Sequence, residues 1–113
     1  MRLTVRVDFD DGTALGPGKT RLLELVADLG SIRKAAAAMA MSYRQAWLLL
    51  QALETTFGAK LVETATGGRA GGGARLTPLG SEVAKTYRKL EISATKAAAK
   101  ALSRLKSLTA DPG

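Results

Sequence analysis

Cysteine and histidine are both absent from the 113 residues of this chain. Structural zinc sites need ligands of these two types, so zinc fingers are excluded. Without cysteine no disulfide bond can form, which is compatible with a reducing cytoplasm. Catalysis by a Ser-His-Asp or Cys-His arrangement is excluded as well, because each arrangement requires a histidine. We therefore expect neither an enzyme nor a metal centre.

Long apolar runs are also missing from the sequence. None approaches the roughly 20 residues that a membrane-spanning helix needs. The segment from Met1 to Asp11 alternates in charge and has no apolar core, so we do not expect a signal peptide. These observations predict a cytoplasmic protein.

Positive charge is what the chain has in excess, with a net charge of +7 and a pI of about 10.2. Residues 1–30 carry four basic and five acidic side chains, residues 31–77 carry six and two, and residues 78–113 carry seven and three. A basic balance favours a polyanionic partner, and nucleic acid is the usual one. Charge alone leaves open a ribosome-like or simply basic soluble protein.

The length fits one domain, residues 1–113, which we expect to begin with a strand. Residues 2–9 alternate between polar and apolar side chains, the apolar ones being Leu3, Val5, Val7 and Phe9. A period of two is typical of a half-buried strand, and residues 10–13 then predict a turn. A lone strand is not stable, so residues 1–13 need a partner elsewhere in the chain or in a second subunit.

Residues 17–58 have the pattern of three helices. The first follows Pro17 and ends at Gly30, with apolar residues at helical spacing at Leu22, Leu23, Val26 and Leu29. Ser31 is a cap for the second, whose stripe is Ile32, Ala35, Ala36 and Met39. The third starts at Ser42, which forms a capping-box pattern with Gln45, and ends at Gly58. Its buried stripe is expected at Ala46, Leu50, Leu53 and Phe57, with Leu49 beside it.

The gap between the second and third helices is only about Ala40 to Ser42. Two short helices joined by so tight a turn predict a helix-turn-helix. Residues 59–77 then predict a wing, with strands near Leu61–Val62 and Ala74–Leu76 on either side of a glycine-rich stretch. We expect Trp47 in the core or wedged between helices.

Thr77 and Pro78 form a strong helix start. Apolar residues then recur every three or four positions, at Val83, Tyr87, Leu90, Ala94, Ala97, Ala101, Leu105 and Leu108. This pattern predicts a helix over residues 78–108 that packs on another helix. Its length of about 45 Å exceeds what a small domain can cover, so we expect a homodimer through it, with strand 2–9 as a further contributor. The whole is then mainly α with a small β component: a winged helix-turn-helix with an N-terminal strand and a long C-terminal dimerisation helix.

Two stretches resemble a known family. Residues 42–47, Ser-Tyr-Arg-Gln-Ala-Trp, and residues 61–77, in which Ala-Thr-Gly-Gly leads into a glycine run, resemble the N-terminal DNA-binding domain of ModE-type molybdate-responsive transcriptional regulators. The spacing of Ser42, Leu50, Leu53, Glu54, Gly58 and Leu61 is similar to that of the wider LysR-type winged helix. The resemblance covers about residues 17–90 and implies a regulator of transcription that binds DNA in the nucleoid.

Two departures from the family pattern limit what the resemblance implies. Regulators of this family usually continue into a C-terminal molybdate-binding module, and this sequence ends at Gly113. We therefore expect no cofactor and carry over no ligand sensing. Position 64 is Thr where the family tends to have Arg, and Arg69 at the expected wing tip is a candidate replacement.

The third helix supplies the first candidate DNA contacts, because the N-terminal turn of a recognition helix reaches base edges in the major groove. These residues are Ser42, Tyr43, Arg44 and Gln45, followed by Leu48 and Gln51. Arg44 has the chemistry to pair with guanine, Gln45 with adenine, and Leu48 to touch a thymine methyl. Contacts to the DNA backbone are expected from Ser31, Arg33 and Lys34 of the second helix and from Lys60, Arg69 and Arg75 of the wing.

These residues also have simpler interpretations. Ser42 and Gln45 are explained by helix capping alone, Tyr43 by packing on the second helix, and a single exposed leucine such as Leu48 is ordinary. For the chain as a whole, the alternatives to a sequence-specific regulator are a nucleoid-like architectural protein of low sequence specificity and a protein-interaction adaptor that uses the long helix. Gly18-Lys19-Thr20 ends like a phosphate-binding P-loop, but Thr13 stands where that motif needs glycine, so we do not expect nucleotide binding.

Overall fold

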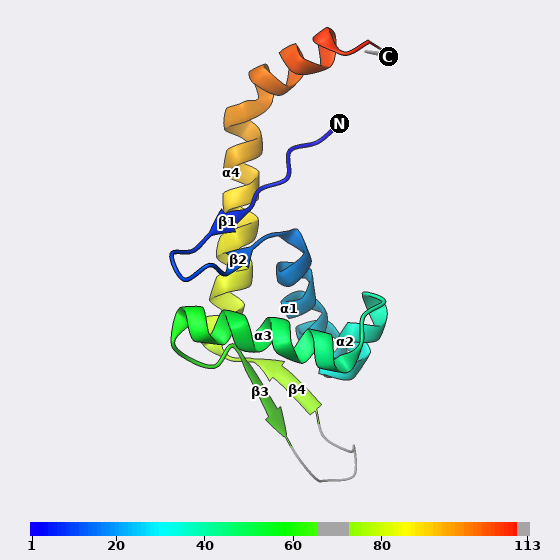
Figure 1. Cartoon of the computed structure of the whole chain (residues 1–113), viewed down its shortest axis with the longest axis vertical. Coiled ribbons are helices and arrows are strands. Elements are labelled where there is room, and N and C mark those ends of the chain that lie inside the picture. Colours follow the sequence, from blue (N-terminus) through cyan, green and yellow to red (C-terminus); the bar gives the residue numbers. More distant parts are fainter. Residues whose placement is uncertain (66–72, 111–113) are drawn as a thin grey trace.

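The computed structural model describes residues 1–65 and 73–110. Along the chain its elements are β1 (Val7–Asp8), β2 (Ala14–Leu15), α1 (Pro17–Leu29), α2 (Ile32–Ala38), α3 (Tyr43–Phe57), β3 (Val62–Ala65), β4 (Gly73–Leu76) and α4 (Pro78–Leu108). Figure 1 shows α1, α2 and α3 gathered near one end of α4, with the β3–β4 hairpin pointing away from the rest of that helix. The predicted fold class, mainly α with a small β component, is confirmed.

The N-terminal strand finds its partner a few residues further along the chain. β1 pairs antiparallel with β2, Val7 opposite Leu15 and Asp8 opposite Ala14. The turn between them includes Gly12, whose φ of 88° lies in the left-handed region. The predicted strand over residues 2–9 is therefore too long, because β2 offers only two residues before Gly16 leads into α1.

The helix boundaries follow from local capping chemistry. The Ser31 hydroxyl accepts a hydrogen bond from the Lys34 N–H at 3.1 Å, and the Ser42 hydroxyl accepts one from the Gln45 N–H at 3.0 Å. α1 and α3 each end at a left-handed glycine, Gly30 with φ 69° and Gly58 with φ 70°. These stops and caps agree with the sequence predictions because each depends on residues within one turn of the helix end.

The hydrophobic core lies where α1, α2, α3 and the start of α4 meet. Its fully buried large side chains are Leu22, Leu23, Val26, Leu53, Leu61 and Tyr87. The predicted stripe of α3 is confirmed, since Ala46, Leu50 and Leu53 are buried and Leu49 and Phe57 pack against them. Leu29 departs from its predicted stripe: it is 42% exposed, because α1 ends there.

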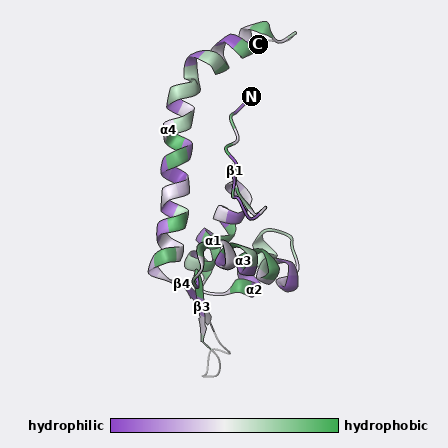
Figure 2. Ribbon diagram, turned by 60° about the vertical axis from the view of Figure 1, so that its left-hand side comes forward, coloured by the Kyte–Doolittle hydropathy of each residue, from purple (hydrophilic) through white to green (hydrophobic). Residues whose placement is uncertain are grey.

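Helix α4 spans the predicted residues, but only its first three turns enter the core. Its buried residues are Gly80, Val83, Ala84 and Tyr87. Beyond them the periodic apolar side chains are exposed, Leu90 by 40%, Leu105 by 55% and Leu108 by 62%. Figure 2 shows this half of α4, with alternating hydrophobic and hydrophilic residues, standing clear of the helical core. The molecule is consequently elongated, with extents of 57 × 29 × 21 Å.

A tight junction at Thr77 joins the wing to α4. The Thr77 hydroxyl donates to the Lys60 carbonyl at 2.7 Å and accepts from the Gly80 N–H at 3.0 Å, while the Thr77 N–H donates to the Leu61 carbonyl at 2.9 Å. On the other strand, the Ala74 N–H donates to the Gly30 carbonyl at 2.9 Å. The base of the wing is thus fixed to α4 and to the end of α1.

Candidate nucleic-acid interface

Helices α2 and α3 are joined by a turn that contains three backbone hydrogen bonds. The N–H groups of Met39 and Met41 both donate to the Ala36 carbonyl at 3.0 Å, and that of Ala40 donates to the Ala37 carbonyl at 3.0 Å. Ala40 has a φ of 56°, the left-handed conformation that lets the chain reverse here. The two helices pack on each other directly. The predicted helix-turn-helix geometry is therefore present.

Helix α3 presents its first turns outward. Tyr43 is 41% exposed and Leu48 is 46% exposed, and the side chains of Arg44, Gln45 and Gln51 are also exposed. The opposite side of the helix is held in the core by Ala46, Leu50 and Leu53. These predicted contact residues therefore share one accessible surface on a helix that is anchored from behind.

The start of α2 lies against this surface. Arg33 and Lys34 are exposed, and Ser31 is half-buried at the cap. The guanidinium of Arg33 stacks over the ring of Tyr43 with its carbon 4.8 Å from the ring centre. Tyr43 thus packs on α2, as one interpretation of the sequence held, and still keeps a large exposed fraction.

The wing carries the remaining predicted residues. Lys60 and Arg75 are both highly exposed; the Lys60 ammonium lies 3.7 Å from a carboxylate oxygen of Glu54, and the Arg75 Nε lies 3.1 Å from one of Glu63. β3 and β4 pair antiparallel, from Val62 opposite Leu76 to Ala65 opposite Gly73. Arg69, the remaining predicted wing contact, lies outside the described residues.

Charge on this face is predominantly positive. Among the residues that the structure describes, Glu54 and Glu63 are each matched by a basic neighbour. Within the same residues Arg33, Lys34 and Arg44 take part in no ion pair. Three cations on α2 and α3 are consequently free to attract an anionic partner.

Glu54 connects α3 to the wing, a role that was not predicted from the sequence, although Glu54 is one of the residues in the family spacing. One of its carboxylate oxygens accepts hydrogen bonds from the Leu61 N–H at 2.8 Å and the Val62 N–H at 3.2 Å. Its side chain is only 15% exposed. The carboxylate therefore fixes the start of β3 to α3 and sets the position of the wing relative to the helix. The available signal was an acidic residue close to the apolar side of α3.

The expectation for Trp47 is wrong. Its side chain is 43% exposed, and it lies neither in the core nor wedged between helices. It borders a small cavity of about 80 Å³ that opens between α3 and the wing. At the preceding position Ala46 takes the buried place on the helix.

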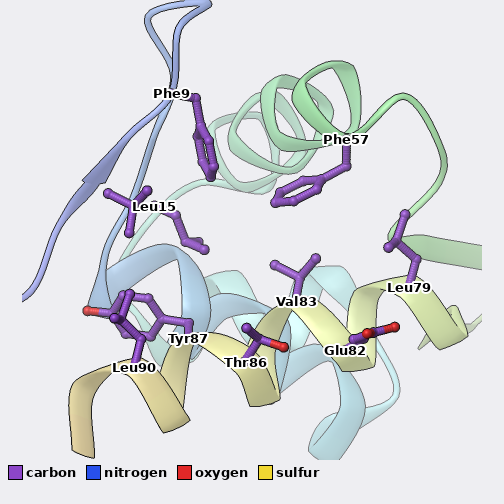
Figure 3. A pocket seen from close by; sticks show the side chains of 10 residues that line it. Phe9, Leu15, Phe57, Leu79, Glu82, Val83, Thr86, Tyr87 and Leu90 are labelled. Carbon is purple, nitrogen blue, oxygen red and sulfur yellow. The ribbon is translucent and has the colours of Figure 1, made fainter. Parts of the chain in front are cut away.

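A second surface lies at the C-terminal end of α3. An apolar groove of about 340 Å³ is enclosed by the β1–β2 hairpin, the end of α3 and the first turns of α4. Figure 3 shows Phe9, Leu15, Phe57 and Val83 turned toward its interior. The rings of Phe9 and Phe57 meet edge to face with their centres 5.5 Å apart, which ties the hairpin to α3.

Lys19 and Thr20, which resemble the end of a P-loop, form hydrogen bonds within the protein. The Lys19 ammonium donates to the Ala14 carbonyl at 2.6 Å, and the buried Thr20 hydroxyl donates to the Gly16 carbonyl at 2.9 Å. Both contacts hold the start of α1, where a phosphate would need the same groups.

Across residues 1–65 and 73–110 no helix combines the length and hydropathy needed to cross a bilayer.

Several named bacterial proteins are similar in sequence to this chain. It is 38% identical over 103 residues to the molybdenum transport protein ModE of Azotobacter vinelandii, which covers 91% of this chain and 38% of that protein. It is 39% identical over 102 residues to the molybdenum-pterin-binding protein MopB of Rhodobacter capsulatus, covering 89% and 36%. The DNA-binding transcriptional dual regulator ModE of Escherichia coli K12 is 38% identical over 71 residues, covering 63% and 27%. The chain thus spans well under half the length of these relatives.

The fold has a counterpart among solved structures. The DNA-binding domain of CbnR, solved in complex with DNA, matches 78% of this chain and 95% of its own with a TM-score of 0.60 and 23% identity. The family model of the bacterial regulatory helix-turn-helix protein, lysR family, matches residues 18–81, which include all of α2, α3 and the wing. This is a family of regulators and not of enzymes, as the sequence predicted. The chain belongs to the lysR family of bacterial regulatory helix-turn-helix proteins.

Proposed function

We propose that this chain is a sequence-specific regulator of transcription that inserts the N-terminal turns of α3 into the major groove of duplex DNA. The observation that carries the proposal is the outward surface formed by Tyr43, Arg44 and Leu48 on a helix whose other side is buried. Such a helix is a rigid probe of the width that the major groove accepts. The names of the relatives, regulators and a DNA-binding domain among them, support the same conclusion.

Residues around α3 would position the protein on the duplex. The cations Arg33 and Lys34 at the start of α2, and Lys60 and Arg75 on the wing, suit phosphate oxygens. Ser42 caps α3, and its helix N-terminus favours a phosphate nearby. The reading residues are Arg44, Gln45, Leu48 and Gln51, which reach outward beyond the cap.

The test is selection of bound sequences from a random pool of duplex DNA, followed by affinity measurements at fixed salt on the selected and a random duplex. A regulator binds the selected duplex at least 10³-fold more tightly. Arg44→Ala should lose roughly 1–3 kcal/mol of discrimination at one base position. The matched control is Lys96→Ala, which removes the same charge from an exposed position on the far half of α4.

A uniform loss on all sequences with Arg44→Ala would point instead to the architectural alternative. That alternative is a nucleoid-like protein which coats DNA with little sequence preference. Absence of binding to any duplex at low salt would reject both and leave the adaptor interpretation. Repeating the selection with molybdate present tests whether that anion alters the chosen sequence.

We further propose that the chain works as a homodimer through α4. The exposed apolar side chains Leu90, Leu105 and Leu108 continue, at helical spacing, the face that packs on the core through Val83. A second copy of α4 is the occupant that matches a stripe of this length. Light scattering should give twice the monomer mass of 11.8 kDa for the wild type, and a monomer for Leu105→Lys with Leu108→Lys. A monomeric wild type would contradict the proposal.

A further inference from the structure

Trp47 is an unusually exposed tryptophan on the wing side of α3. The side chain is 43% exposed, although a tryptophan is normally withdrawn from water. It stands one turn after Tyr43 and one turn before Gln51, both exposed. Tryptophan is enriched at binding surfaces because it combines a large apolar face with one hydrogen-bond donor. The exposure of Trp47 on the same helix as the reading residues therefore indicates that its side chain contacts a binding partner.

The direction of Trp47 follows from helix geometry. Successive residues turn by roughly 100° around an α-helix, so Trp47 and Glu54, seven residues apart, lie on nearly the same side. Glu54 holds the start of β3 through the Leu61 and Val62 N–H groups. Trp47 consequently faces the wing, whereas Arg44 and Leu48 lie further round the helix on its outermost side.

The space beside Trp47 is a cleft lined by both polar and apolar residues. The cavity is lined by the polar residues Gln51, Glu54, Lys60 and Thr64 and, beside Trp47, by the apolar residues Ile32, Leu50 and Val62. The Glu54 carboxylate is already engaged by two N–H groups and lies 3.7 Å from the Lys60 ammonium. The Lys60 side chain is 78% exposed, so its charge remains accessible to an anion.

We infer that Trp47 contacts the sugar–phosphate backbone of duplex DNA at the mouth of this cleft, a statement that rests on the proposed function. With the recognition helix in the major groove and the wing on the neighbouring backbone, the DNA strand between them would pass the mouth of the cleft between helix and wing. The indole face packs on deoxyribose, its N–H donates to a phosphate oxygen, and Lys60 supplies the neutralising charge. Such a contact positions the protein and carries no base information.

The chain provides its own reporter for this contact, because Trp47 is its single tryptophan. The full chain is titrated with the selected duplex and with a random duplex while indole emission, acrylamide quenching and the anisotropy of labelled DNA are recorded. We expect emission to change and quenching to fall on both duplexes, over the concentration range in which anisotropy rises. Binding by anisotropy with unchanged emission and quenching overturns the inference and leaves the proposed function standing. No anisotropy change on either duplex overturns the proposed function itself.

Two substitutions separate a contact from a structural role. Trp47→Ala should weaken binding by about tenfold on both duplexes with an unchanged specificity ratio, whereas Trp47→Phe keeps most of the affinity. Circular dichroism and thermal unfolding verify that both variants fold. A loss confined to the selected duplex would show that Trp47 reads a base and would overturn the backbone placement.

The salt dependence of DNA affinity tests the role of Lys60 beside Trp47. Lys60→Ala should lower the slope of log affinity against log salt by about 0.9, since one phosphate contact is lost. Trp47→Ala removes no charge and should leave that slope unchanged. A slope that is unaltered by Lys60→Ala would mean that no phosphate lies in the cleft.

Discussion

Arg88 on α4 binds Glu24 on α1 through two parallel hydrogen bonds. The Nε and Nη2 atoms of Arg88 donate to the two carboxylate oxygens of Glu24 at 3.0 and 2.8 Å, and its Nη1 donates to Glu91 at 2.7 Å. A planar guanidinium that meets a carboxylate in this way fixes orientation as well as distance. The pair connects α4 to α1 at the last turn of α4 that is buried.

Removing the Arg88–Glu24 ion pair should make the free energy of unfolding less dependent on pH in the acidic range. Arg88 holds the pKa of Glu24 below its ordinary value of 4.5, so the folded state favours the ionised carboxyl. The stabilisation is complete above that ordinary value and is lost as the pH falls through the lowered pKa. We expect Glu24→Gln to lower the free energy of unfolding by about 1 kcal/mol at pH 7, since the pair is about one-third exposed.

Urea unfolding of both proteins at pH 7 and pH 3 measures this effect. The difference between wild type and Glu24→Gln should shrink at the lower pH. Asp28→Asn is the control, because Asp28 is an exposed carboxyl on the same helix. An equal difference at both pH values would show that charge does not cause the stabilisation.

Gly80 should tolerate no side chain. A Cβ at this position would lie 2.1 Å from the carbonyl oxygen of Leu61, a backbone atom that also accepts the Thr77 N–H. We expect Gly80→Ala to cost about 1–3 kcal/mol of stability or to prevent folding, because wing and helix must separate. Gly18→Ala, where nothing lies within 4 Å, should be neutral or stabilising in the same thermal unfolding experiment. Equal melting temperatures for the two variants would contradict the close approach.

Ala40 should be improved by glycine. Its φ of 56° belongs to the left-handed region, which costs an L-residue roughly 1–2 kcal/mol. Glycine removes most of this strain but has a more flexible unfolded chain, so we expect Ala40→Gly to stabilise the protein by up to about 1 kcal/mol. Ala37→Gly, an exposed position within α2, should destabilise it by about 1 kcal/mol. Chemical denaturation of both variants measures the two changes in stability. Changes of the same sign would contradict a strained left-handed conformation at Ala40.

Glu54→Ala should loosen the base of the wing. The substitution leaves the Leu61 and Val62 N–H groups without their acceptor, at a cost of about 1–3 kcal/mol. Hydrogen exchange at these two amides should accelerate more than exchange in α1. Glu63→Ala removes the same charge from an exposed pair with Arg75 and should change stability by less than about 0.5 kcal/mol. Unchanged exchange at Leu61 and Val62 would show that Glu54 does not anchor the strand.

Helix ends and helix order were predictable from the sequence because their causes are local. Ser31, Ser42 and Thr77 each cap a helix through an N–H three residues further on. Gly30 and Gly58 end their helices through one left-handed residue. The same locality explains why residues 78–108 were predicted as one helix, and why the outward residues of α3 followed from its buried stripe.

The errors in the prediction have a different cause. The strand expected over residues 2–9 shrank to Val7–Asp8, since strand length depends on the partner, and β2 is cut short by the start of α1. Trp47 was expected in the core or wedged between helices, yet it is 43% exposed. Its exposure results from the neighbouring Ala46, which occupies the position that faces the core.

The sequence by itself determined the helices, their caps, the tight turn between α2 and α3, and the exposure of Arg44, Gln45, Leu48 and Gln51 on α3, because a few neighbouring side chains are sufficient for each. Only the tertiary structure decided that Glu54 binds the start of β3, that Arg88 and Glu24 connect α4 to α1, and that the Tyr87 hydroxyl donates to the Val5 carbonyl at 2.6 Å. These contacts join residues that are 8, 64 and 82 positions apart. No local pattern encodes such pairs, since they form only when the packed core brings separate elements together.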